Sequence, residues 1–251
     1  MPIGQFREEW RIRRGIAQLS VGGGVARQSY LQKIIAMFGT SLIGYWPGNE
    51  EAGTVAVDYS GNGYNGVYTG VTLGQEGIGD GLTCPLYDGA NDFMQPPVGF
   101  RTAWNGLEFS MGGWFQTTAW TDGVARNLFK VEVDGNNFIR VFKSTVNNRI
   151  SIRLSAGAAT SNKDIDISPS IFFHFMVVVS RSGNYLRGYI NGVASGADVT
   201  IGGDWVGTPA AATTVVGAGS TTPGSVWSGL IAHVPVLSRA ATSAEVAMMG
   251  L

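Results

Sequence analysis

The chain contains little cysteine, little charge and no long apolar run, and each of these absences excludes a class of protein. Cys84 is its only cysteine, so it can form neither an internal disulfide nor a cysteine-cluster metal site. Charged residues make up 14% of the chain and sum to a net charge of −1, which argues against nucleic acid as a partner. No apolar run reaches the length that a membrane span requires. The first residues are polar and rich in arginine, so we expect no secretory signal.

Glycine is abundant instead, with 37 residues and no collagen-like period. From residue 41 onward, short apolar or alternating runs follow one another, and each is bounded by Gly, Asn, Asp or Pro. Examples are the runs 109–116, 127–133, 138–142, 149–154, 172–180 and 185–190. Many short strands joined by tight turns would produce this pattern. It predicts an all-β protein, an antiparallel β-sandwich with one core.

Two of these runs flank residues 144–148 and predict a hairpin. Polar and apolar residues alternate in Arg149–Leu154, as they do in strands with one buried face, and Phe138–Lys143 is apolar apart from Arg140 and Lys143. We expect the cations of this hairpin on one face of the sheet and its apolar residues on the other. Asn191-Gly192, between apolar residues, predicts a second hairpin with a two-residue turn.

The first forty residues differ from the rest in charge. They hold six basic and two acidic residues, a net of +4, whereas the remainder holds eleven basic and sixteen acidic residues, a net of −5. Apolar residues at helical spacing predict a short helix over Val25–Phe38, with Gly39 as its C-cap. We therefore divide the chain into a basic N-terminal arm with a short helix, residues 1–40, and a β-domain, residues 41–251.

The arm has two interpretations. It is either a solvated extension or a segment that grips an acidic partner or a neighbouring copy of the chain. The residues that we expect to make the assembly contacts are Arg7, Trp10, Arg11, Arg13 and Arg14.

Short motifs along the β-domain occur in the order found in one fold family. They are Tyr45-Trp46 with the loop Asp58–Gly66, then Tyr87–Phe93, Met111–Phe115, Phe173–Val179, Tyr189–Gly192 and the tail Gly229–Glu245. In this order they resemble the concanavalin A-like jelly roll of the laminin-G-like type, over residues 41–251. The resemblance implies a jelly-roll sandwich. It also implies a module that binds glycans or proteins, since most members do so and only some are enzymes.

Loops rich in Asp and Asn suggest calcium, which takes several oxygen ligands on tight turns. The candidate calcium ligands are Asp58, Asn62, Asp88 and Asp92. The family's closing strand usually carries an acid where this chain has Ala232, so one ligand is missing. The other interpretation, which we favour, is that these carboxylates form turns by accepting backbone N–H groups.

Tryptophan beside an acid suggests glycan binding, because the ring covers the apolar face of a sugar while carboxylates bind its hydroxyls. The candidate ligand-binding residues are Trp120, Asp122, Asp204, Trp205 and Trp227, all in turn-like stretches. The alternative, which is more frequent for any single tryptophan, is a buried ring that anchors a loop.

Catalysis has weaker support. Glycosidases of this fold place acids alternately along one strand, whereas Glu132 and Asp134 are followed by Asn136 and Asn137. His174 lies within an apolar run, and no nucleophile or nucleotide motif is present. We predict that the protein is not an enzyme.

The arm and the single module together predict a virion structural protein, a capsid decoration or tail-associated subunit, by analogy with bacteriophage proteins that carry laminin-G-like domains. Its partners would be other virion proteins or copies of itself, and it would be made in the host cytoplasm. The alternative is an extracellular lectin-like, carbohydrate-binding module. A third hypothesis is a glycosidase that depends on Glu132.

Overall fold

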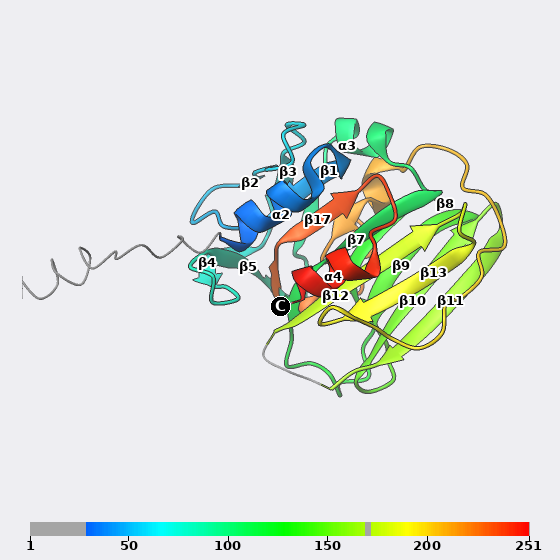
Figure 1. Cartoon of the computed structure of the whole chain (residues 1–251). Helices are drawn as coiled ribbons and strands as arrows, with labels where there is room; N and C mark the ends of the chain where they lie inside the picture. The colour runs from blue at the N-terminus through cyan, green and yellow to red at the C-terminus, as the bar shows by residue number, and fades with distance from the viewer. Residues whose placement is uncertain (1–28, 169–171, 251) are drawn as a thin grey trace, which may run out of the picture.

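The computed structural model describes residues 29–168 and 172–250, and every structural statement below refers to these residues. The predicted assembly residues from Arg7 to Arg14 lie outside this range. Two antiparallel sheets are stacked face to face (Figure 1), which confirms the predicted sandwich. None of the described helices combines the length and the apolar character needed to cross a membrane.

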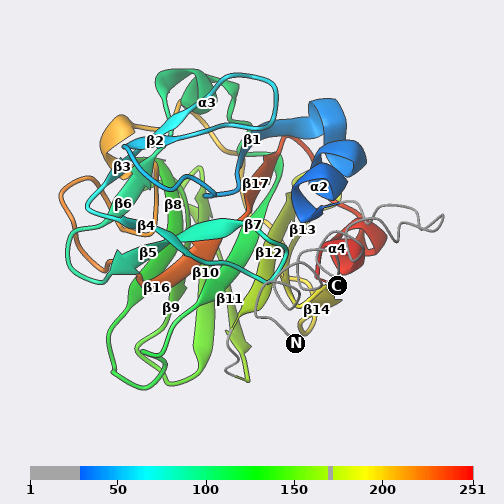
Figure 2. The ribbon, with the colours of Figure 1, turned by 90° about the vertical axis from the view of Figure 1, so that its left-hand side faces the viewer.

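One sheet has nine strands. In chain order these are β1 Leu42–Trp46, β4 Thr72–Glu76, β5 Thr83–Asp88, β7 Glu108–Gln116, β12 Phe173–Ser180, β13 Tyr185–Ile190, β14 Val193–Ala194, β16 Ser228–Ala232 and β17 Val234–Leu237. In space the order is β14–β13–β12–β7–β16–β5–β4, and β17 pairs with both β7 and β1. In Figure 2, β4 and β5 are turned toward the viewer, and they form one edge of this sheet.

The other sheet has eight strands, in the spatial order β11–β10–β9–β8–β15–β6–β3–β2. In chain order these are β2 Val55–Ala56, β3 Gly66–Thr69, β6 Phe93–Gln95, β8 Arg126–Asp134, β9 Asn137–Lys143, β10 Arg149–Ala156, β11 Ala159–Asp166 and β15 Val215–Val216. All six predicted runs are strands, with ends within two residues of the prediction. The predicted turn of Asn191 and Gly192 is present, with φ of 48° and 78°, as a two-residue hairpin turn requires.

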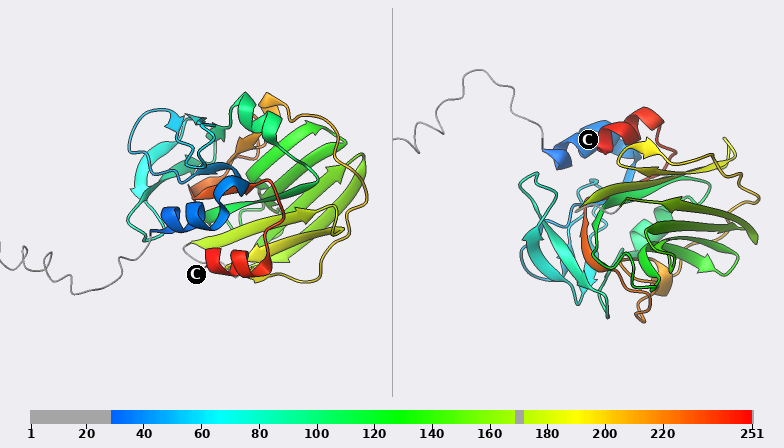
Figure 3. Two further views of the ribbon diagram at one scale, coloured as in Figure 1. Left: turned by 45° about the horizontal axis from the view of Figure 1, so that its top comes forward. Right: turned by 90° about the horizontal axis from the view of Figure 1, so that it is seen from below.

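Three α-helices complete the fold: α2 Tyr30–Phe38, α3 Val98–Ala103 and α4 Ser243–Met249. Ser29 begins α2 and Thr242 begins α4, each through a capping box. The right-hand view of Figure 3 shows α2 and α4 against the outer face of the nine-stranded sheet. Two short 3₁₀ turns, Gly39–Ser41 and Ala211–Thr213, lie in the connections.

Helix α2 is part of the folded body. Its Ile34 and Phe38 are buried in one cluster with Val246 and Met249 of α4 and with Tyr189 of the sheet. The packed body therefore extends back to Ser29, and the domain division predicted at residue 40 runs through this cluster.

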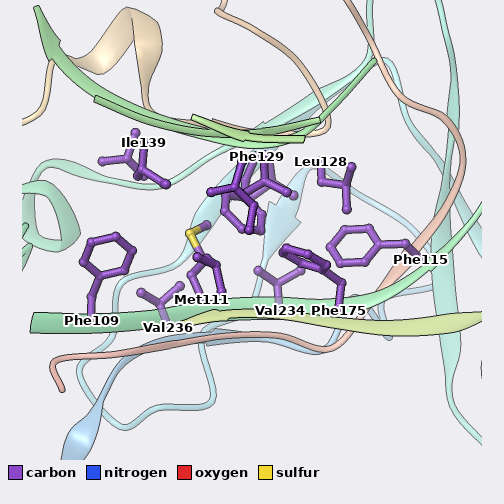
Figure 4. Packing of buried hydrophobic residues seen from close by; sticks show 14 of the residues in the cluster. Phe109, Met111, Phe115, Leu128, Phe129, Ile139, Phe175, Val234 and Val236 are labelled. Carbon is purple, nitrogen blue, oxygen red and sulfur yellow. The ribbon is translucent and has the colours of Figure 1, made fainter. Parts of the chain in front are cut away.

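The main core lies between the two sheets. Figure 4 shows Phe109, Met111 and Phe115 of β7 facing Leu128 and Phe129 of β8, all of them buried. Alternation places the three β7 side chains on this face, because every second side chain of a strand points toward the other sheet. Leu128 and Phe129 are consecutive, and both reach the core because the pairing of β8 with β9 shifts register between Asn127 and Phe129.

The outer face of β12 is buried as well, beneath the helices. Neither ring nitrogen of His174 on this strand has a hydrogen-bond partner among the described residues. Burial, with a smaller contribution from Lys33, lowers the pKa of His174 to about 3. His174 is therefore a neutral core residue at neutral pH.

The predicted hairpin of β9 and β10 forms, but two details of the prediction were wrong: Lys143 lies on the inner face, and Phe138 and Phe142 share the outer face with Arg140. Arg140 and Arg153 face outward, whereas Lys143 is fully buried on the inner face. Its ammonium donates to the carboxylate of Asp122 and to the carbonyl of Val124. A buried ammonium needs such partners, and only the folded loop 119–126 supplies them.

Candidate functional site

Both oxygens of the predicted calcium ligand Asp58 accept hydrogen bonds from the protein. Oδ1 accepts the backbone N–H groups of Tyr45 and Ser60, each at 2.9 Å. Oδ2 accepts the backbone N–H of Tyr64 at 2.8 Å and the hydroxyl of Ser60 at 2.7 Å. The buried carboxylate thus fastens the loop 58–66 to β1.

The other three predicted calcium ligands also bond the backbone. The amide of Asn62 donates to the carbonyl of Leu42 at 2.8 Å. Asp88 accepts the N–H of Ala90, and Asp92 accepts the N–H of Asp88, both at 2.7 Å. Within residues 29–168 and 172–250, no three acidic, histidine or cysteine side chains are grouped so as to hold a metal ion.

The predicted pair of Trp120 and Asp122 lies where a loop meets the core. The ring of Trp120 is 4% exposed and packs against Phe173 with a centroid separation of 5.4 Å. Asp122 forms ion pairs with Arg126, at 2.8 Å, and with Lys143. Burial opposes ionisation of Asp122, but the hydrogen bonds led by Lys143 outweigh it and lower its pKa to about 2.

The remaining predicted ligand-binding residues are divided between core and surface. Trp205 is 8% exposed and Trp227 is fully buried, and the indole N–H of Trp227 donates to the carbonyl of Gln116 at 3.2 Å. Asp204 is an exposed partner of Arg181. In this structure, none of the three predicted tryptophan rings offers an open face to a sugar.

A groove that no sequence motif predicted lies on the outer face of the nine-stranded sheet. It has a volume of about 530 Å³ and is lined by Glu76, the loop residues 77–79, Gln116, Phe172 and Leu230. Gln116 of β7 lies directly opposite Leu230 of β16, and the loop comes from the hairpin of β4 and β5.

The hairpin loop 77–82 has a tight backbone. A Cβ on Gly77 would lie 2.4 Å from the carbonyl oxygen of Leu82, so only glycine fits there. Gly79 and Gly81 both have φ of 89°, in the left-handed region. The run of glycines at 77, 79 and 81 is therefore the one sequence signal that could have indicated this part of the groove.

A buried network holds this loop in place. Asp80 Oδ2 lies 3.0 Å from His233 Nε2, and His233 Nδ1 lies 2.7 Å from the hydroxyl of Tyr45. The ring of Tyr30 on α2 packs edge-on against His233, with centroids 4.6 Å apart. Burial would raise the pKa of Asp80, but the hydrogen bond and charge of His233 lower it. The network ties the loop to β1 and α2, which makes the groove a pre-formed site.

The groove combines groups of three kinds. Phe172 and Leu230 supply apolar surface, Gln116 an amide and Glu76 an exposed carboxylate. The side chains of Gln116 and Glu76 make no hydrogen bond to another described residue, so their polar atoms remain available to a ligand. An apolar wall with a few convergent polar groups is the usual form of a small-ligand site.

The fold and its motifs are those of a known family. The family model of the concanavalin A-like lectin/glucanases superfamily matches residues 88–247. The chain therefore belongs to this superfamily, as the order of its motifs predicted. Among curated protein sequences, none is significantly similar to it.

Solved structures show the same architecture. Domain 4 of AbnA, an extracellular arabinanase from Geobacillus stearothermophilus solved with arabinotriose, is 17% identical, with a TM-score of 0.57 over 84% of this chain and 98% of that domain. Trypanosoma rangeli sialidase is 13% identical, with a TM-score of 0.59 over 84% of this chain and 32% of the sialidase. The binding domain of botulinum neurotoxin serotype D is 15% identical, with a TM-score of 0.60 over 85% of this chain and 52% of that domain. These similarities establish the fold alone.

Proposed function

We propose that this protein is a non-catalytic recognition domain that binds neutral sugar chains in the groove of Glu76, Gln116, Phe172 and Leu230. One observation carries the proposal: the groove places an aromatic ring beside an amide and a carboxylate. The ring and Leu230 suit the apolar face of a sugar, and the two polar groups suit its hydroxyls. The carboxylate of Glu76 favours a neutral sugar over an acidic one.

The similarity to a whole arabinanase domain that was solved with arabinotriose supports a sugar ligand. The composition of the groove supports a non-catalytic role. Glycoside hydrolysis uses two carboxylates, one on each side of the scissile bond. Of the described residues that line the groove, Glu76 is the only acid. Glu132 forms an ion pair with Lys130 on the other sheet. The sugar contacts come from side chains, so the proposal requires no cofactor.

Removing the amide or the ring of the groove should weaken sugar binding. A glycan array would select the ligand, with arabinotriose as the first probe, and calorimetry would measure its affinity. Gln116→Ala and Phe172→Ala should each raise the dissociation constant at least tenfold, because each removes a direct contact. Gln95→Ala, on the other sheet, is the matched control and should leave the affinity unchanged. Full affinity in both groove variants would rule out this site.

We also propose, as a second function, that the protein is a virion structural subunit, a decoration or tail-associated protein, anchored by its basic N-terminal residues. This second proposal rests on the way α2 is attached to the folded body. The hydroxyl of Tyr30 donates to the carbonyl of Met249 at 3.1 Å, and Lys33 donates to the carbonyl of Met248. Residues 1–28, which carry five of the six cations of the first forty residues, precede this fixed helix. They would reach a neighbouring copy or another virion protein from a defined point.

Truncation tests the anchoring role. Deleting residues 1–28 leaves α2 in place, so the body should keep the melting temperature of the full chain. The full chain should self-associate in sedimentation velocity, and the truncated chain should sediment as a monomer. Exchanging Arg7, Arg11, Arg13 and Arg14 for glutamine should reproduce the loss, since the contacts are electrostatic. Equal sedimentation of the full and truncated chains would count against the assembly role.

A further inference from the structure

Three cations lie side by side on the outer face of the eight-stranded sheet. Lys130 of β8 is directly opposite Arg140 of β9, and Arg140 is directly opposite Arg153 of β10. Neighbouring strands are roughly 5 Å apart, and like charges directly opposite each other destabilise a sheet. A row of three cations therefore destabilises the sheet, and binding of a ligand that needs these charges would account for their presence.

The central cation of this row is the one without an acidic partner. Lys130 forms an ion pair with Glu132, and Arg153 forms one with Asp164 at 2.7 Å. The guanidinium of Arg140 donates through Nε to the amide oxygen of Asn127, and no described carboxylate forms an ion pair with it. Three cations and two acids leave one positive charge uncompensated, at Arg140.

Arg140 also lies between two aromatic side chains on its own strand. Phe138 and Phe142 share the outer face with it, because Ile139 and Val141 point into the core. The guanidinium stacks on Phe142, 4.1 Å from the ring centroid. Phe138 belongs to no hydrophobic cluster, and its cross-strand neighbours are Glu132 and Ser155.

We propose that this surface, the Arg140 face, binds a sugar residue that carries one carboxylate. The free edge of the Arg140 guanidinium binds the carboxylate in a two-point contact, for which the planar fork of arginine is suited. The sugar ring lies on Phe138, beside the carboxylate of Glu132. The Arg140 face is on the opposite sheet from the groove, so this inference does not depend on the groove being a sugar site.

The charges around Arg140 and the strand pairing of β9 limit which kind of ligand can bind to the Arg140 face. Glu132 and Asp164 flank the row and would repel a densely charged polyanion, whereas a single carboxylate balances the single uncompensated cation. Residues 1–28 of this chain carry a net positive charge, which does not suit the positive charge of Arg140. An extended peptide cannot add to the sheet here, because β9 is already paired with β8 and β10. A carboxylated sugar meets all of these conditions.

The test uses the full chain with digalacturonic acid, in which each sugar residue carries one carboxylate, and with its dimethyl ester, which keeps the rings but removes both charges. Calorimetry at low salt should show at least tenfold tighter binding of the acid. Arg140→Gln should abolish that preference, and Arg140→Lys, which keeps the charge but not the fork, should reduce it. Phe138→Ala should weaken both ligands. Arg149→Gln, on the same sheet outside the row, is the charge-matched control and should change nothing.

Several results would overturn the proposal. They are equal binding of acid and ester, wild-type affinity in Arg140→Gln, or an equal loss in Arg149→Gln, which would indicate a general charge effect. Binding of an acidic peptide through Arg140 without binding of digalacturonic acid would assign the face to a protein partner instead. Lys130→Gln serves as a second variant should Arg140→Gln fail to fold. Gln116→Ala should bind digalacturonic acid normally, which separates this site from the groove.

Discussion

Asp58→Ala lowers the free energy of unfolding by about 4 kcal/mol, the largest effect that we expect from a single substitution outside the hydrophobic core. The carboxylate accepts three backbone N–H groups and one hydroxyl, from Tyr45, Ser60 and Tyr64. Alanine leaves the buried N–H of Tyr45 and the partly buried donors of Ser60 and Tyr64 unpaired, and it releases the loop 58–66 from β1. Chemical denaturation monitored by tryptophan fluorescence would measure the change.

Asp88→Ala is the matched control for Asp58. Asp88 is also a predicted calcium ligand at a turn, but it is exposed and accepts only the N–H of Ala90. We expect it to cost less than about 1 kcal/mol. Equal effects of the two substitutions would contradict the structural role of Asp58. A loss in Asp58→Ala that occurs only when calcium is present would instead support the calcium hypothesis.

Asp122→Ala should cost about 3 kcal/mol, because it leaves the ammonium of Lys143 buried without its counter-charge. Its matched control is Asp204→Ala. Both acids lie beside a predicted sugar-binding tryptophan, but Asp204 is 66% exposed and pairs only with Arg181. An exposed pair of this kind contributes about 0–1 kcal/mol. Thermal or denaturant unfolding of the two variants gives the comparison.

The same ion pair predicts a pH dependence. The pKa of Asp122 in the folded protein is about 2, below its unfolded value of 3.8. Its stabilising effect is therefore fully present above pH 4 and is lost as the pH falls through 2. Unfolding free energies measured between pH 5 and pH 2 should fall more steeply for the wild type than for Asp122→Ala. Parallel curves would show that Asp122 does not titrate in this way.

Local sequence patterns were sufficient for the strands because the information lies within each strand. Alternation in Arg149–Leu154 indicated that Ile150 and Ile152 face the core and that Arg153 faces outward. The residue types in Phe138–Lys143 do not alternate, and the prediction that the cations share one face failed at Lys143, which is buried on the inner face. The folded loop that carries Asp122 and Val124 supplies the partners that make this position stable.

Residue type suggested tryptophans and acids as sugar ligands, but residue type does not determine exposure. Trp120 and Trp227 lie in turn-like sequence, yet both rings pack in the core between the sheets. The groove could not be predicted because its walls come from the loop 77–79 and from Gln116, Phe172 and Leu230, which are remote from one another in the chain. No local pattern records that these segments meet.

The amino-acid sequence alone determined the class of fold, the order of its motifs and the positions of its longer strands, since periodicity and turn chemistry act between near neighbours. The tertiary structure decided which polar groups are already bonded to other groups of the protein. Asp58 and Asp122 are held by partners within the protein, whereas Glu76, Gln116 and Arg140 retain groups that a ligand can use. The physical reason is that hydrogen bonding and burial depend on residues that only folding brings together.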